Sequence, residues 1–308
     1  MKELKYVYGP VPSRRLGISL GISPIPKKTC NYSCIYCQLG RTDRMTNSRR
    51  VFFPLEDIVK ELEYVLANDI YFDVITIVGE GEPTLCENLG AIIGEIRKRT
   101  DKPVAVITNG ALLYDPQVRK ELALADIVSP TLDAFDEDSF KKINRPHGAL
   151  AYGKVIQGLK GFADNYRGQL WIELMLVKGY NDDDASLLKY AELLKGIRYD
   201  RLYINTPVRP PAEASVREAD RDRIERATEL LGGISIELLV SQGFHSEVPD
   251  DYQAILSIIK RHPMNQFEIE GFLNSRGTND TDAIIRRLKD DPDVDTLDYK
   301  GYITFRLQ

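Results

Sequence analysis

Between residues 53 and 231, the apolar positions of the chain alternate between two periods. From Leu55 to Ala67 they recur every three or four residues, which is typical of a helix with one buried face. The run from Val74 to Val78 is continuous and mostly β-branched, which indicates a strand buried on both faces. The alternation predicts strands at 18–22, 74–78, 104–107, 127–128, 170–177 and 202–204, and helices at 55–67, 89–96, 118–124, 149–162, 183–194 and 219–231.

Strands that alternate with helices predict a parallel sheet with right-handed crossovers, and therefore an α/β fold. In a barrel of such repeats, the chemistry lies at the carboxyl ends of the strands. Polar segments directly follow three of the predicted strands, at 79–84, 108–110 and 129–134. We therefore expect the site at this edge, in a domain that covers residues 1–240.

The alternation stops around Ser241 to Gly243, and a second pattern follows. It predicts three helices and then two strands joined by Lys300 and Gly301. Three helices followed by a β-hairpin is the element order of a winged helix, so residues 245–308 are expected to form a small winged-helix-like domain. The predicted helices are 252–261, 266–273 and 278–288, and the predicted strands are 294–299 and 302–307.

Composition places the chain among soluble globular proteins, with 43% hydrophobic and 28% charged residues in 308. The sequence contains no apolar run of membrane-spanning length. Only four cysteines are present, which argues against a disulfide framework and for a reducing compartment, so we expect a cytoplasmic protein with no membrane partner.

Charge argues against a DNA-binding role for the C-terminal domain. The whole chain has a formal net charge of -5, and the residues after Gly243 include twelve acidic and eight basic ones. Binding to DNA depends on the neutralisation of phosphates by Lys and Arg. We therefore favour a module that contacts protein or presents a substrate, and DNA is not expected as a partner.

Three of the cysteines, Cys30, Cys34 and Cys37, lie within eight residues. A structural zinc site needs four ligands, and neither a second CxxC nor a nearby His supplies the rest. A redox-active CxxC at Cys34 and Cys37 is an alternative. Three thiolates from one loop suit a [4Fe–4S] cluster that leaves one iron open for another ligand.

This CxxxCxxC, with the aromatic Tyr36 before its last cysteine, resembles the signature of the radical S-adenosylmethionine (SAM) superfamily. The resemblance implies a partial (β/α)6 barrel of the TIM type, a [4Fe–4S] cluster on the three cysteines, and SAM bound at the open iron. It also implies reductive cleavage of SAM to a 5′-deoxyadenosyl radical that abstracts a hydrogen atom. The electron would come from a donor of the flavodoxin or ferredoxin type.

The polar segments after the strands resemble the SAM-binding motifs of that superfamily. Gly79 to Thr84 resembles its "GGE" segment, in which backbone groups and the glutamate hold the methionyl amine. Either Glu80 or Glu82 could be the glutamate that binds the methionyl amine, and we favour Glu82. For Asp133 and Ser129, which follow a later strand, the alternative role is capping of a loop or helix. The resemblance implies a SAM site formed by Tyr36 beside the adenine, Gly81, Glu82, Pro83, Asn109, Ser129 and Asp133.

Four further stretches resemble the small radical SAM proteins grouped with the wybutosine-pathway tRNA synthase. The archaeal synthases carry extra cysteines for a second cluster, whereas this chain has only Cys86, which we interpret as a buried small apolar residue. We therefore do not transfer the wyosine activity. The four stretches are Gly9–Gly17, Cys37–Gly40, Lys142–His147 and Tyr203–Pro211.

The sequence does not identify a catalytic residue beyond the cofactor site. Glu173, in the middle of a predicted buried strand, is either a site residue or paired with a basic neighbour. Several basic residues near strand ends could bind an anionic substrate, or could be ordinary solvated side chains. The basic residues are Arg14, Arg15, Arg145, His147, Lys178 and Arg209, and the catalytic candidates are Arg145, His147, Glu173 and Arg209.

Three functional hypotheses follow. The favoured one is a radical SAM enzyme that acts on a peptide or protein docked partly by the C-terminal domain. The second is an enzyme that modifies an RNA base, as in tRNA. The third is a non-enzymatic iron–sulfur regulator, against which the predicted SAM pocket argues. The substrate, the product, the hydrogen abstracted, the fate of SAM and the oligomeric state are not specified by the sequence.

Overall fold

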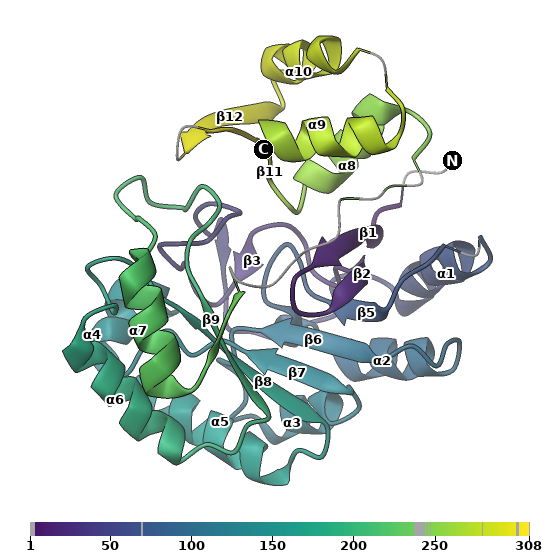
Figure 1. Ribbon diagram of the computed structural model, residues 1–308. Helices are drawn as coiled ribbons and strands as arrows, with labels where there is room; N and C mark the ends of the chain where they lie inside the picture. The colour runs from purple at the N-terminus through teal and green to yellow at the C-terminus, as the bar shows by residue number, and fades with distance from the viewer. Residues whose placement is uncertain are drawn as a thin grey trace.

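The computed structural model describes residues 4–68, 70–236, 244, 246, 248–278, 280–299 and 302–307. Its centre is an eight-stranded sheet in the order β1-β2-β5-β6-β7-β8-β9-β10 (Figure 1). Strands β2 to β10 of this order are parallel, and β1 is antiparallel to β2. The strands are β1 (Val7–Ser13), β2 (Gly17–Ile22), β5 (Val74–Ile77), β6 (Val104–Thr108), β7 (Ile127–Pro130), β8 (Gln169–Met175), β9 (Arg201–Asn205) and β10 (Ile234–Ser235).

Helices that connect the parallel strands pack against the sheet through apolar faces. In α1, the buried residues Ile58, Leu62 and Val65 recur at helical spacing. Burial of one such side chain contributes about 1.5–3 kcal/mol. The helices are α1 (Leu55–Leu66), α2 (Leu89–Arg97), α3 (Pro116–Leu122), α5 (Tyr152–Asn165), α6 (Asp184–Lys195) and α7 (Arg221–Leu231). The result is the parallel α/β sheet that the sequence pattern predicts, arranged as the partial barrel that the family resemblance implies.

Two segments of the barrel differ from the sequence-based expectation. The approach to β2, expected to be turn-rich, forms the strand β1, which contains Pro10 and Pro12. An edge strand tolerates proline because one side of it needs no ladder hydrogen bonds, and the register of β1 shifts between Tyr8 and Val11. The other unpredicted segment follows β7. It contains the one-turn α4 (Glu137–Ser139) and a π-helical turn, η2 (Phe140–Asn144).

The C-terminal residues form a unit with its own apolar core, which includes Ile255, Phe272, Leu288 and Phe305. The predicted order of helices and strands is present, with one additional two-residue strand, β11, paired to β13. The predicted Lys300-Gly301 turn lies outside the described residues. The elements are α8 (Asp251–Ile259), β11 (Met264–Asn265), α9 (Gln266–Ser275), α10 (Thr281–Asp290), β12 (Val294–Tyr299) and β13 (Tyr302–Leu307).

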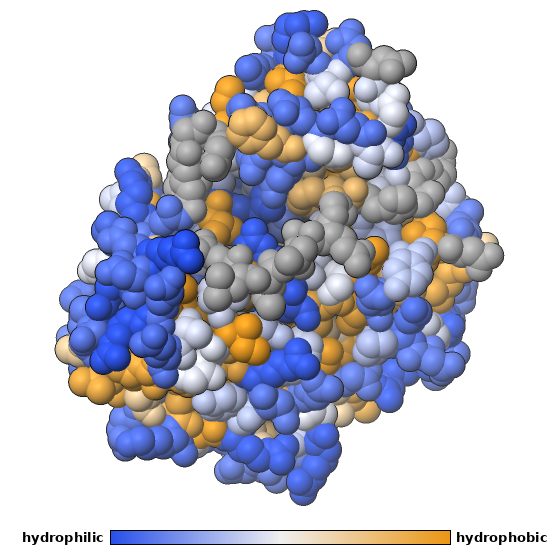
Figure 2. Space-filling model, in the orientation of Figure 1, coloured by the Kyte–Doolittle hydropathy of each residue, from blue (hydrophilic) through white to orange (hydrophobic). Residues whose placement is uncertain are grey.

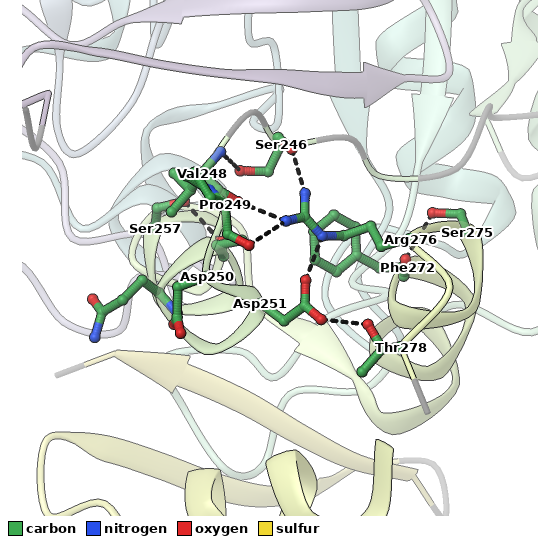
Figure 3. Close-up of polar contacts among 12 residues, drawn as sticks. Ser246, Val248, Pro249, Asp250, Asp251, Ser257, Phe272, Ser275, Arg276 and Thr278 are labelled. Carbon is green, nitrogen blue, oxygen red and sulfur yellow. Dashed lines mark hydrogen bonds and ion pairs between the residues drawn. The ribbon is translucent and has the colours of Figure 1, made fainter. Parts of the chain in front are cut away.

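Arg276, at the end of α9, fixes the segment that leads into this C-terminal unit (Figure 3). Its Nε donates to Asp251 at 2.5 Å, and its two terminal nitrogens donate to the backbone oxygens of Ser246 at 2.6 Å and Val248 at 2.7 Å. The guanidinium also lies 5.4 Å from the ring centroid of Phe272. These contacts join Ser246, Val248 and Asp251 to the end of α9.

The C-terminal unit lies beside β1 and β2 (Figure 1), and its residues reach segments that follow three of the parallel strands. Its Glu268 pairs with Arg209, which follows β9, and its Arg261 pairs with Glu80, which follows β5. The backbone oxygen of Leu307 accepts a hydrogen bond from Lys27, which follows β2, at 2.7 Å. One unit thus contacts the segments that follow three strands. Figure 2 shows that most residues on the visible face of the C-terminal unit are hydrophilic.

Among the described residues, no helix is long and apolar enough to cross a membrane.

Candidate active site

The loop that carries the three cysteines is held by backbone hydrogen bonds at several points. It begins as β3 (Thr29–Cys30), which pairs in parallel with β4 (Arg44–Met45). The η2 turn supports its middle, because the amides of Ser33 and Ile35 donate to the backbone oxygens of Asn144 and Ile143 at 3.0 Å. The cysteines therefore occupy a fixed loop at the carboxyl end of β2.

The three thiols are partly buried, and two of them accept hydrogen bonds from amide side chains. Asn109 Nδ2 lies 3.6 Å from Cys30 Sγ, and Asn144 Nδ2 lies 3.6 Å from Cys34 Sγ. Burial raises the pKa of all three thiols, and raises that of Cys34 well above its usual value. The thiolate forms would therefore need a nearby positive charge, which the iron ions of a bound cluster would supply.

The donor set of the cysteine loop is sulfur only, which suits an iron–sulfur cluster. Within the described part of the chain, no three His, Cys, Asp or Glu side chains are placed to hold one ion. The cysteine ligands of a four-iron cluster bind different iron atoms, so they need not converge on one point. Cys86 is fully buried in the barrel core and donates to Asn88 Oδ1 at 2.8 Å, which confirms its interpretation as a buried residue.

Gly81 packs directly against the start of the cysteine loop. Thr29 and Gly81 form a parallel bridge, and a Cβ added to Gly81 would lie 1.9 Å from the backbone oxygen of Thr29. That oxygen also accepts a hydrogen bond from the amide of Glu82 at 3.0 Å. Only glycine fits this close approach, which joins the segment after β5 to the cysteine loop.

The buried carboxylate of Glu82 is surrounded by donors from the protein itself. Its Oε1 accepts from the amide and hydroxyl of Thr84 at 2.9 and 2.5 Å and from the hydroxyl of Thr108 at 2.6 Å. Its Oε2 accepts from the amide of Asn109 at 2.7 Å. Burial raises the pKa of Glu82, and these bonds oppose that rise. A carboxylate can accept about four hydrogen bonds. The donors of Thr84, Thr108 and Asn109 therefore fill the acceptor sites of Glu82.

Asn109 connects this carboxylate to the cysteine loop. Besides its contact with Cys30, its side chain donates to Asn31 Oδ1 at 2.7 Å and accepts from the amide of Ala111 at 2.9 Å. The left-handed backbone of Gly110, with a φ of 73°, follows it. Pro83, the first residue of the short 3₁₀ turn η1 (Pro83–Leu85), fixes the other end of the motif.

Asp133 and Tyr36, both predicted at the SAM site, contact each other. The Tyr36 hydroxyl donates to Asp133 Oδ2, which also accepts from Asn144 Nδ2 at 2.9 Å. The other oxygen accepts from the amide of Met175 at 3.0 Å. Burial raises the pKa of Asp133 to about 6. This carboxylate joins the cysteine loop, η2 and the end of β8.

Ser129 is the predicted SAM residue whose polar group lacks a protein partner. It lies on β7, is 4% exposed, and its hydroxyl has no hydrogen-bond partner among the described residues. A buried hydroxyl without a partner costs free energy, which a polar ligand at the strand end would recover. A separate narrow cavity, which Ser129 does not line, lies among Asn109, Asp133, Asn144 and apolar residues of α5.

Of the four catalytic candidates, Glu173 lies deepest in the barrel. It forms an ion pair with Arg15 and accepts a hydrogen bond from Asn205 Nδ2 at 2.9 Å. Burial lowers the pKa of Arg15 to about 10. Arg15 is thus the basic partner that a carboxylate on a buried strand was expected to need.

Arg145 and His147 brace the cysteine loop from outside. Arg145, in a left-handed conformation with a φ of 46°, pairs with Glu213, which also pairs with Arg41. The amide of His147 donates to the backbone oxygen of Asn31 at 2.8 Å, and its Nδ1 accepts from the amide of Ala149. The side chain of Arg145 is thus ion-paired, and that of His147 is hydrogen-bonded, to neighbouring protein groups.

Arg209 lies at the contact between the barrel and the C-terminal unit. Its guanidinium pairs with both oxygens of Glu268, at 3.1 and 3.2 Å, and lies 2.7 Å from His262 Nε2. Burial and the neighbouring Arg209 and Arg14 hold the pKa of His262 well below its usual value. Neutral His262 can therefore accept the hydrogen bond that Arg209 donates.

Sequence reasoning did not single out several residues that connect the site. Asn31 and Asn144 hold the cysteine loop to β6 and η2, Asn205 binds Glu173, and Arg261 reaches Glu80 from the C-terminal unit. Asn144 and Asn205 lie in stretches that carry the family resemblance, and this resemblance was the one sequence signal that could have identified them as site residues. The contacts of Asn31 and Arg261 join distant parts of the chain and leave no local pattern.

Comparison with known proteins agrees with this geometry. A family model described as "Radical SAM superfamily" matches residues 25–191, which include the cysteine loop and the strands β5 to β8. The chain belongs to the radical SAM superfamily. Within that class it is similar over nearly its whole length to UPF0026 protein MJ1312 of Methanocaldococcus jannaschii, with 38% identity over 309 residues, 97% of this chain and 94% of the relative.

Solved structures share the fold of the barrel. A structure of TYW1 with a lysine–pyruvate adduct aligns with a TM-score of 0.51 and 20% identity, covering 69% of this chain and 72% of that one. Streptococcus suis SuiB bound to the precursor peptide SuiA aligns with a TM-score of 0.53 and 15% identity, covering 69% of this chain and 46% of SuiB. At these identities the likeness shows the fold alone.

Membership of the superfamily establishes the type of chemistry and the cofactors. The protein is a SAM-cleaving enzyme that uses a [4Fe–4S] cluster and SAM. When bound, the cluster and SAM supply reductive cleavage that forms a 5′-deoxyadenosyl radical. The contribution of the protein is to hold these groups, to order the loops around them and to exclude water.

Proposed function

We propose that Cys30, Cys34 and Cys37 hold the cluster, and that the loops after β5, β6 and β7 hold SAM. Support for the cluster comes from the sulfur-only donor set on one braced loop. Support for SAM comes from the partnerless hydroxyl of Ser129 and from the close packing of Gly81 on the cysteine loop. In this arrangement Gly81, Pro83, Asn109 and Ser129 border SAM, and Tyr36 lies beside the adenine.

Glu82 and Asp133 act in this proposal as positioning residues. Protein donors surround both carboxylates, from Thr84, Thr108 and Asn109 at Glu82 and from Asn144 and Met175 at Asp133. Each carboxylate therefore fixes the loops that border SAM, and backbone groups of the segment after β5 are left to meet the methionyl amine.

The favoured substrate is a peptide or protein that binds where the C-terminal unit meets the barrel mouth. The observation that carries this proposal is that one unit contacts three strand ends, through Glu268, Arg261 and Leu307. A substrate that approaches the ends of β2, β5 and β9 would therefore lie close to this unit. The fold of SuiB, whose structure was solved with a precursor peptide, is compatible with a peptide substrate.

RNA is the second candidate, favoured by the shared fold of TYW1. The twelve acidic and eight basic residues after Gly243 argue against strong phosphate binding by the C-terminal unit. The regulator hypothesis is not carried further, because the superfamily consists of SAM-cleaving enzymes.

The test is anaerobic reconstitution of the cluster, followed by quantification of 5′-deoxyadenosine under reductant with native-source extract. Extract is pretreated with RNase, or with protease followed by inhibitor, and a Cys34→Ala sample serves as the inactive control. The proposal predicts stimulation that protease removes and RNase leaves. Stimulation that only RNase removes would overturn the peptide substrate in favour of RNA.

A further inference from the structure

Arg261 is a buried cation of the C-terminal unit whose side chain contacts the barrel. It follows α8, which packs against β1 (Figure 1). Its Nη2 donates to the backbone oxygen of Lys5 at 2.8 Å, and its guanidinium carbon lies 4.5 Å from the ring centroid of Tyr8. Burial of a guanidinium is costly unless the group is hydrogen-bonded and paired, so this side chain needs an anionic partner.

The anionic partner is Glu80, in the segment after β5. Its Oε2 lies 3.7 Å from Arg261 Nε, and the two side chains are only 8% and 4% exposed. Its other oxygen, Oε1, has no hydrogen-bond partner among the residues that the structure describes. Lys27 also acts on Glu80, but its ammonium donates to the backbone oxygen of Leu307 at 2.7 Å. The pairing with Arg261 therefore fixes the position of the Glu80 carboxylate.

The position of Glu80 is coupled through the backbone to the proposed SAM site. Gly81, the next residue, packs against the cysteine loop at Thr29, and Glu82 binds the amide of Asn109 in the loop after β6. A displaced carboxylate at Glu80 would therefore shift the two residues that connect the segment after β5 to both neighbouring loops.

The backbone of Arg261 contacts the cysteine loop independently of its side chain. Gln38, which follows Cys37, donates from Nε2 to the backbone oxygen of Arg261 at 3.5 Å. The backbone oxygen of Gln38 accepts from Arg306 Nη1 at 3.4 Å. A substitution at Arg261 therefore breaks the contact with Glu80 and leaves these contacts with the cysteine loop in place.

We propose that Arg261 is a positioning residue for SAM, because it fixes through Glu80 the segment 79–83 that borders SAM. The inference rests on the proposed SAM site in the loops after β5, β6 and β7. The C-terminal unit is then part of the cofactor site, since the group that orders a SAM-binding segment comes from that unit. Arg261 does not touch SAM and acts on its affinity through Glu80.

The experiment is a double-mutant cycle of Arg261→Gln and Glu80→Gln on the reconstituted enzyme, with SAM as the ligand. Loss of one partner leaves the other charge buried and unpaired, whereas loss of both removes the two charges together. The readouts are the dissociation constant of SAM and the iron bound per chain. The matched control is Glu268→Gln, which removes another ion pair between the C-terminal unit and the barrel, at Arg209.

The proposal predicts that Arg261→Gln and Glu80→Gln each bind SAM at least about 10-fold more weakly, with the iron content of wild type. The double variant binds SAM no more than about twofold more weakly than either single variant, because both changes act through the same pair. The affinity of Glu268→Gln for SAM stays within about twofold of wild type.

Wild-type SAM affinity in Arg261→Gln would overturn the positioning role. Losses that multiply in the double variant would also overturn it, since the two side chains would then act independently. An equal loss in Glu268→Gln would assign the effect to general loosening of the C-terminal unit. If Arg261→Gln does not fold, Glu80→Gln tests the same pair, and wild-type SAM affinity there overturns the proposal. A wild-type protein that carries the cluster and binds no SAM would instead overturn the proposed function.

Discussion

The carboxylate of Glu82 accepts the backbone N–H of Asn109 at 2.7 Å, and the side chain of Asn109 lies 3.6 Å from Cys30 Sγ. One buried acid thereby links the loop after β5, the loop after β6 and the cysteine loop. Because one group fixes all three loops, the geometry of the proposed SAM site depends on a carboxylate whose oxygens are hydrogen-bonded to the protein itself.

Replacement of Glu82 by Gln is expected to weaken SAM binding more than cluster binding. The new amide group would point donors at the donors of Thr84, Thr108 or Asn109, and a buried donor left without an acceptor costs about 1–3 kcal/mol. A loss of that size corresponds to about a 10- to 100-fold weaker affinity for SAM. Equilibrium dialysis on reconstituted enzyme, with iron content as the control, checks this result. Wild-type SAM affinity in Glu82→Gln would contradict the positioning role.

Replacement of Gly81 by Ala is expected to displace the cysteine loop and to lower the iron bound per chain. The added Cβ would lie 1.9 Å from the backbone oxygen of Thr29, and a backbone clash cannot be relieved by turning a side chain. The matched control is Gly94→Ala in α2, where no atom lies within 4 Å of the added Cβ. That change should be neutral or stabilising by up to about 1 kcal/mol.

Iron analysis and thermal denaturation of the two glycine variants measure this difference. Equal iron content in Gly81→Ala and Gly94→Ala would show that the contact between Gly81 and Thr29 does not hold the loop.

The contact between Arg209 and His262 predicts a pH dependence of stability. Burial and the two arginines hold the folded-state pKa of His262 well below its unfolded value of about 6.5. The unfolded state therefore binds a proton first as the pH falls, and stability is lost below about pH 6.5. The loss approaches about 1.4 kcal/mol per pH unit until the folded-state pKa is reached.

Urea unfolding of wild type and His262→Gln between pH 7.5 and 5.5 checks this prediction. Gln retains an acceptor for Arg209 and does not titrate, so the free energy of unfolding of the variant should fall less over this range. Parallel pH profiles for the two proteins would contradict the assignment of neutral His262.

Local sequence patterns predicted most of the barrel. Continuous β-branched runs such as 74–78 and apolar spacings such as Ile58, Leu62 and Val65 are properties of short segments, so the sequence reveals them. Strand β1 was missed because Pro10 and Pro12 resemble turn residues, and its place at the sheet edge is a tertiary property.

The side-chain directions at the site could not be read from the sequence. The pairing of Glu173 with Arg15 brings together residues 158 positions apart. The donors around Glu82 come from two different loops, so the family motif predicted where the carboxylate lies but not what it contacts. The brace from η2 to the cysteine loop likewise depends on a π-helical turn with no local signature.

The most direct measurement of the central claim is the yield of 5′-deoxyadenosine from reconstituted protein under dithionite, in wild type, Cys34→Ala and Cys86→Ala. Cys86→Ala is the matched control, because it removes the one buried cysteine outside the loop. We predict 5′-deoxyadenosine from wild type and Cys86→Ala and none from Cys34→Ala. An intact cluster that yields no 5′-deoxyadenosine from SAM, or a Cys34→Ala protein as active as wild type, would contradict the assignment of the cysteine loop as the SAM-cleaving centre.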